Sequence, residues 1–178
     1  MNTGVAYSSA EEIEVHGFSL AATIGLPLLA VFLQAYIPIA FHGRLHFFNV
    51  FDLPLLITIF FAVSRRNPAS GAVTGCMIGL LQDALTAKFI GLFGIAKTVV
   101  GYAASSLGSK IDVDNPGSRL LITIAFYMLH RGMYLAVQRG MVQENLAGDW
   151  LHHLGAAVAN GFLAVVLFAI LDRFKRRS

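Results

Sequence analysis

The sequence predicts an all-α integral membrane protein, a bundle of six transmembrane helices. Its 178 residues are 56% hydrophobic and only 13% charged, with a mean hydropathy of +0.68. A soluble domain normally has about 25% charged residues, so the deficit indicates a membrane protein. Six apolar segments of about 20 residues would use most of the chain. We therefore expect one membrane domain over residues 19–171, between cytoplasmic tails of residues 1–18 (polar) and 172–178 (basic).

Polar and proline-containing turns separate the six apolar segments. Asp52 opens the second segment as an N-cap, and Pro54 suits the helical turn that follows it. Asn67-Pro68 separates the second segment from the third, and Asn115-Pro116-Gly117 is a strong turn signal before the fifth. The predicted segments are, approximately, residues 19–40, 50–63, 69–87, 89–107, 119–138 and 150–171.

Lys and Arg are distributed unequally between the two sides of the predicted bundle. Because basic residues concentrate on the cytoplasmic side, the pattern predicts an inner-membrane protein with both termini in the cytoplasm. Losing or merging the second or third segment, both weakly hydrophobic, would leave five spans and place the termini on opposite sides. One side carries Arg65, Arg66, Lys110, Arg119, Arg173, Lys175, Arg176 and Arg177; the other carries Arg44, Lys88 and Arg139.

The stretch from Gly71 to Tyr102 combines regularly spaced glycines with two charged residues. Gly71, Gly75 and Gly79 lie four residues apart, and Asp83 occupies the next step, so one helix face is a smooth stripe that ends in a carboxylate. Such stripes let two helices approach closely in a membrane, either within the bundle or with a partner's helix. The following segment carries Gly91, Gly94, Lys97, Thr98, Gly101 and Tyr102.

Four polar side chains are expected to form intramembrane contacts, because a charge there costs about 2.5–3.5 kcal/mol. Asp83 and Lys97 lie at similar depths, which raises the hypothesis of an interhelical pair. In the alternative, Asp83 lies at the outer interface and Lys97 extends toward it. Arg131 faces the bundle interior or a partner helix, or it reaches lipid phosphate. Asn160 is expected to bond across a helix interface, within this chain or to a partner.

No sequence motif indicates catalysis or phosphate binding, so we expect neither an enzyme nor a bound cofactor. Four histidines fall on one predicted side and could hold a transition metal. They lack accompanying Cys or acidic ligands, which favours interface histidines and no metal site. The single cysteine, Cys76, excludes an internal disulfide. The basic residues form no patch suited to nucleic acid. The four histidines are His42, His46, His152 and His153.

The glycine-rich stretch resembles the rod shape-determining protein MreD family. That family has a glycine-spaced helix ending in Gly-Leu-x-x-Asp, and then a Leu-Gly segment leading into Lys-Thr-x-x-Gly-Tyr. Upstream, Asp52 and Arg65-Arg66 are similar to the family's aspartate-led second helix and its basic exit. The matching residues are Gly79, Leu80, Asp83, Gly91, Leu92, Gly94, Lys97, Thr98, Gly101 and Tyr102.

This resemblance implies a non-enzymatic scaffold of the machinery that builds the lateral cell wall of rod-shaped bacteria. The implied partners are MreC, cytoskeletal MreB through indirect contact, and the RodA glycosyltransferase with its partner transpeptidase. Membrane lipids and a second copy of the chain are further candidates. The resemblance also implies a bundle similar to the substrate-binding subunits of energy-coupling-factor transporters. A vitamin- or metal-binding transporter subunit is therefore the alternative function, although only Ala21-x-x-x-Gly25 matches those subunits' alanine-spaced motif.

Overall fold

The computed structural model describes residues 17–41, 48, 50–86, 89–108, 110–111, 115–142 and 150–176. The fold is all-helical, and each predicted segment corresponds to one helix. The helix that replaces the predicted segment 119–138 extends beyond it at both ends. The six helices are α1 (Leu20–Ala40), α2 (Leu53–Arg65), α3 (Pro68–Thr86), α4 (Leu92–Gly108), α5 (Pro116–Val142) and α6 (Trp150–Leu171).

Side-chain caps define where the first three helices begin. Ser19 accepts a hydrogen bond from the backbone N–H of Ala22, and Asp52 accepts one from that of Leu55, so each satisfies an otherwise unpaired donor. Asn67 does the same for α3 through Ser70. Arg66, in the left-handed conformation with a φ of 53°, ends α2 and turns the chain directly into α3.

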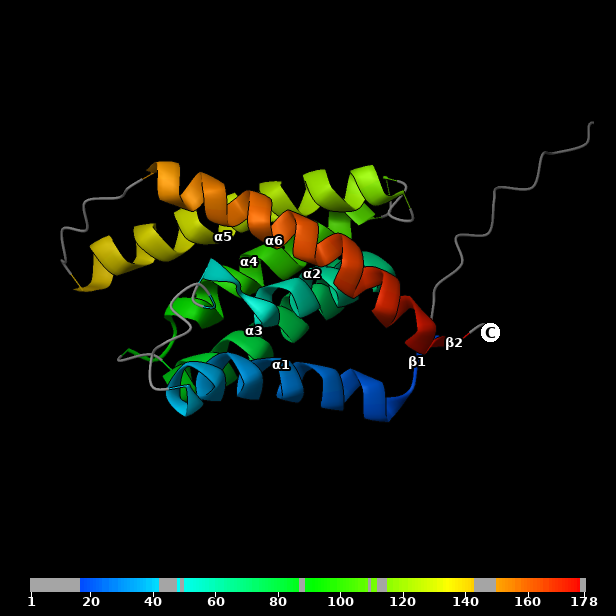
Figure 1. Ribbon diagram of the computed structural model, residues 1–178, viewed down its shortest axis with the longest axis horizontal. Helices are drawn as coiled ribbons and strands as arrows, with labels where there is room; N and C mark the ends of the chain where they lie inside the picture. Colours follow the sequence, from blue (N-terminus) through cyan, green and yellow to red (C-terminus); the bar gives the residue numbers. More distant parts are fainter. Residues whose placement is uncertain are drawn as a thin grey trace, which may run out of the picture.

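Helix α2 is the core of the bundle, although it is the shortest. Figure 1 shows it between α1 on one side and the α5–α6 pair on the other, next to α3 and α4. Every residue from 54 to 64 is buried, including the large side chains of Leu55, Phe60 and Phe61. With 13 residues, α2 is about 20 Å long at about 1.5 Å per residue. The longer helices therefore surround α2 and shield it.

The two ends of the described chain lie together. Strand β1 (Gly17–Phe18) precedes α1 and pairs antiparallel with β2 (Lys175–Arg176), which follows α6 and a short 3-10 helix, η2 (Asp172–Phe174). Arg119, near the start of α5, forms an ion pair with Asp172 at 2.6 Å. These contacts hold the start of α1 and the end of α6 at one end of the bundle.

Three of the described helices, α1, α5 and α6, are long and apolar enough to cross a membrane. Helix α2 is apolar but shorter, and its burial means that it meets protein rather than lipid. Helices α3 and α4 carry the glycines and polar residues of the central stretch, which lower their hydropathy. The molecule is thus a helical membrane protein in which the glycine-rich helices α3 and α4 lie beside the core helix α2.

Candidate functional site: the glycine seam and the buried polar network

The predicted glycine stripe forms a tight seam between α3 and α4. Gly71, Gly75 and Gly79 are all buried. A side chain at Gly75 would overlap the backbone carbonyl of Lys97, and one at Gly101 would overlap the carbonyl of Gly71. The two helix backbones therefore touch, which only glycine permits. Since α4 fills the stripe, the stripe itself offers no groove to a partner helix.

The other residues that match the family's motif, from Gly91 to Tyr102, have two kinds of environment: some pack inside the fold, and others lie on its surface. Gly91 has a φ of +109°, a conformation suited to glycine, in the turn that leads into α4. Gly94 is buried against Leu80, and Thr98 donates a hydrogen bond to the Gly94 carbonyl at 2.7 Å. Tyr102 differs from these, because its side chain is 58% exposed on the outer face of α4.

Asp83 caps the start of α4. Its carboxylate accepts hydrogen bonds from the backbone N–H groups of Gly91 (2.9 Å), Phe93 (3.0 Å) and Gly94 (2.9 Å), and its side chain is fully buried. The first N–H groups of a helix lack partners within the helix and carry partial positive charge. The carboxylate therefore satisfies them and closes the α3–α4 turn.

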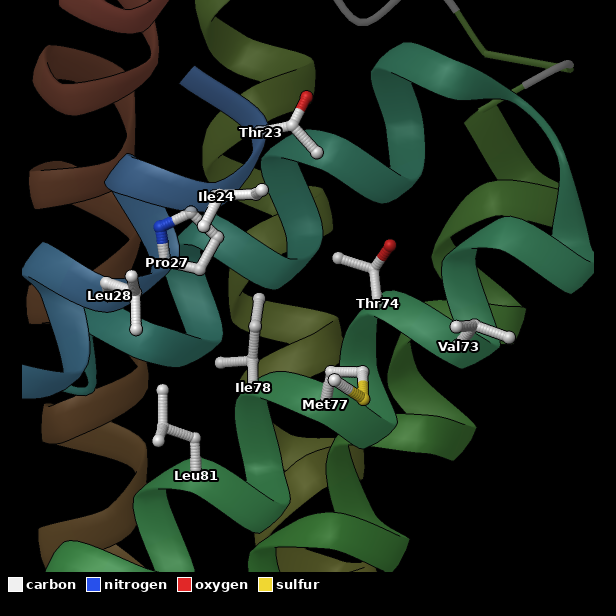
Figure 2. Close-up of a pocket in the computed structure, with 9 residues that line it drawn as sticks. All are labelled: Thr23, Ile24, Pro27, Leu28, Val73, Thr74, Met77, Ile78 and Leu81. Carbon is white, nitrogen blue, oxygen red and sulfur yellow. The ribbon is translucent and has the colours of Figure 1, made fainter. Parts of the chain in front are cut away.

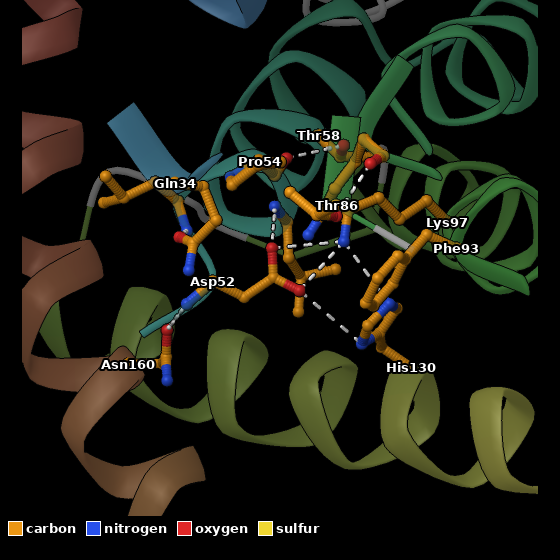
Figure 3. A network of polar contacts seen from close by, with 12 residues as sticks. Gln34, Asp52, Pro54, Thr58, Thr86, Phe93, Lys97, His130 and Asn160 are labelled. Atoms are coloured by element: carbon orange, nitrogen blue, oxygen red, sulfur yellow. Dashed lines mark hydrogen bonds and ion pairs between the residues drawn. The ribbon is translucent and has the colours of Figure 1, made fainter. Parts of the chain in front are cut away.

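Lys97 pairs with Asp52 rather than with Asp83. Its ammonium lies 3.1 and 2.9 Å from the two Asp52 carboxylate oxygens and 3.3 Å from Nε2 of His130 (Figure 3). Lys97 therefore neither pairs with Asp83 nor extends to the outer interface, as the two hypotheses from the sequence proposed. The ammonium only donates hydrogen bonds, so Nε2 accepts and the His130 ring proton is on Nδ1. That nitrogen faces Asp52 at 3.9 Å. The ring of Phe93 covers the ammonium at 5.0 Å.

The start of α2 is held from α1 and α6 as well. Asn160, fully buried on α6, accepts a hydrogen bond from the Asp52 backbone N–H at 3.0 Å and donates to the Val50 carbonyl at 2.8 Å. Gln34 on α1 accepts one from the Leu53 backbone N–H at 3.1 Å. Asn160 therefore bonds within this chain. Together with Lys97 and His130, these side chains connect the start of α2 to four other helices.

Arg131 lies at the α5–α6 contact. Its Nε donates to Nε2 of His153 at 3.3 Å, and its guanidinium lies over the Tyr134 ring at 5.4 Å. Of the four histidines considered as a metal set, His42 and His46 lie outside the described residues. Among the described residues, no group of three or more His, Cys, Asp or Glu side chains is arranged to hold a metal ion.

Sequence reasoning identified Asp52 as a helix cap but did not predict its ion pair, and it assigned no contact to His130 or Gln34. One signal was available. A buried lysine requires a carboxylate, and Asp52 opens α2 on the side where α4 begins, close in depth to Lys97. In the resulting cluster, the charged groups of Asp52 and Lys97 are paired with each other. Such pairing is typical of side chains that hold helices together and not of a catalytic site.

The family model for rod shape-determining protein MreD matches residues 17–177. The chain belongs to the MreD family. The match includes all six helices, the seam and the polar network, and family membership makes this a non-enzymatic membrane protein of rod-shape determination. No curated protein and no solved structure matches the chain. The expected similarity to transporter substrate-binding subunits therefore has no support among solved structures.

Proposed function

We propose that this MreD-family protein is a scaffold of lateral peptidoglycan synthesis, which holds the transmembrane helix of MreC and, with it, the RodA glycosyltransferase and its partner transpeptidase. The contact with MreB is indirect, through MreC. The observation that carries the proposal is the family match over nearly the whole chain. The internal connections support it, because the buried Lys97 is paired with Asp52 inside the bundle and the outward-facing helix surfaces are left largely apolar for contact with other helices.

All six helices cross the inner membrane in this proposal, and both termini lie in the cytoplasm. The pairing of β1 with β2 supports an even number of crossings, because it brings the residues before α1 next to those after α6. A five-span arrangement would separate these residues by the whole bilayer. A reporter fused after Ser178 should be active only in the cytoplasm, and activity only outside the cell would contradict this orientation.

The outer face of α4 is the proposed seat of the MreC helix. Tyr102 is the most exposed residue of the matched motif at 58%, and Ile95, two turns earlier on the same face, is 42% exposed. The glycines of the motif lie in the seam and its turn, Asp83 caps α4, and Lys97 pairs with Asp52. An exposed tyrosine on an apolar helix face supplies both contact area and a hydroxyl that can bond across a helix interface.

The test is co-purification of MreC from membranes in mild detergent. Tyr102→Ala should reduce the amount of MreC recovered. Tyr36→Ala is the matched control, because Tyr36 is 51% exposed on α1. Equal recovery with both variants would exclude the α4 face as the seat. Failure of the unmodified protein to recover MreC would refute the scaffold role itself.

A further inference from the structure

An apolar groove of about 400 Å³ lies between α1 and α3, away from the seam and the polar network. Figure 2 shows its walls: Ile24 and Leu28 from α1 face Val73 and Met77 from α3, and Ile78 lies between them. Val73 and Met77 are 63% and 66% exposed, whereas Ile78 is buried. The groove therefore opens onto the lipid and has a packed floor.

Arg65 is bound to Thr23, one of the residues that line this groove. It donates to the hydroxyl of Thr23 on α1 at 3.0 Å and to that of Ser70 on α3 at 3.4 Å, so it bridges the two helices that form the walls. Thr23 itself lines the groove. Stacking over the Phe61 ring at 5.3 Å fixes the guanidinium further. Arg66 follows in the turn between α2 and α3.

The charge of Arg65 is not neutralised within the part of the chain that the structure describes. A guanidinium has five N–H donors, and here two of them reach neutral hydroxyls. No described carboxylate forms an ion pair with it, in contrast to Lys97, which is paired with Asp52. A fixed, half-exposed guanidinium with unused donors favours an anion, and phosphate matches its fork geometry.

We propose that the groove binds one anionic phospholipid, with the headgroup phosphate on Arg65 and an acyl chain along the apolar walls. The apolar part alone would not select a ligand, because lipid tails are as apolar as the groove. Selection therefore comes from the charged end. The lipid belongs to the leaflet next to the α2–α3 turn, and the proposal does not depend on MreC binding.

The lining and length of the groove suit an acyl chain. The α3 wall runs from Val73 to Leu81, which is about 12 Å at about 1.5 Å per residue, and the lining is apolar apart from two threonines. An extended hydrocarbon chain can lie along such walls while its phosphate reaches Arg65, whereas an apolar helix would leave the free donors of Arg65 without an anion.

Native mass spectrometry of the full-length protein tests the site. The protein is purified in mild detergent and supplied with equal amounts of palmitoyl-oleoyl phosphatidylglycerol and phosphatidylcholine. The unmodified protein should retain phosphatidylglycerol about fivefold more than phosphatidylcholine, the effect of one cationic side chain near anionic lipid. Arg65→Gln should abolish this preference, and Arg173→Gln, which changes an exposed arginine after α6, should preserve it.

A second variant keeps the test decisive if Arg65→Gln loosens the α1–α3 contact. Val73→Trp fills the groove from its exposed edge and should remove retention of both lipids. Val166→Trp is its matched control, because Val166 is 60% exposed on α6. The proposal is overturned if Val73→Trp retains phosphatidylglycerol like the unmodified protein, or if the two lipids are retained equally. Photo-crosslinking from position 77 to the MreC helix in membranes would also overturn it.

Discussion

Asp52 and Asp83 are both carboxylates inside the bundle, but they are stabilised in different ways. Asp83 is satisfied by three backbone N–H groups, all from residues 8 to 11 positions further along the chain. Asp52 is satisfied mainly by Lys97, 45 residues away, while its backbone N–H bonds to Asn160, 108 residues away. One carboxylate closes a local turn, and the other connects distant helices.

This difference determines how each site should respond when the carboxylate loses its charge. Backbone N–H groups carry only partial charges, so Asp83 can lose its own charge without leaving a full opposite charge unpaired. Lys97 carries a full charge in a fully buried position, so it depends on Asp52. We therefore expect the two aspartates to respond very differently to the same substitution.

The largest effect is expected from Asp52→Asn. The variant keeps the size of the side chain but leaves the Lys97 ammonium without its counter-ion, which should cost about 3–5 kcal/mol in the free energy of unfolding. Thermal unfolding of the purified protein in detergent measures it. Adding Lys97→Met should restore much of the loss, because the unpaired charge is then removed. If the double variant loses the sum of both single losses, the two residues are not coupled.

Gly79→Ala should push α3 and α4 apart at the end of the seam that lies next to Asp83. The new methyl group would lie 2.7 Å from the N and Cα atoms of Gly94, whose N–H donates to Asp83. Overpacking of this kind costs about 1–3 kcal/mol. Gly155→Ala on α6 is the control, because nothing lies within 4 Å of its added Cβ. Equal unfolding temperatures for the two variants would show that the seam adjusts without cost.

The helices and the close contact of α3 with α4 could be predicted from the sequence, and the polar partners could not. Helix positions follow from apolar segments and caps such as Asp52, which are local signals. The spacing of Gly71, Gly75 and Gly79 marks a face of close approach but does not name what fills it. The similar depth of Asp52 and Lys97 was a signal for their pairing, but the choice between Asp52 and Asp83 depends on how α2, α4 and α5 pack, and no local pattern specifies that packing.

Asp83→Asn should cost less than either change, about 1 kcal/mol, because one oxygen remains to accept backbone N–H groups and one donor is left unsatisfied. The same thermal unfolding measurement applies, with and without Lys97→Met. The cost should be nearly the same in both backgrounds, because Asp83 and Lys97 share no hydrogen bond. A strong dependence on Lys97 would instead make the two carboxylates one electrostatic unit.

Arg131→Gln is expected to have the smallest effect on the free energy of unfolding. It tests whether Arg131 belongs to the buried polar network. Its guanidinium is half-exposed at the α5–α6 contact and bonds to a histidine ring rather than to a carboxylate. Exposed charged contacts contribute less than about 1 kcal/mol, so the unfolding temperature should barely change. His130 lies one residue earlier on α5 and faces the buried pair. A loss for Arg131→Gln as large as that for Asp52→Asn would therefore mean that the buried network extends through α5 to α6. Arg131 would then belong to the same network as Asp52 and Lys97.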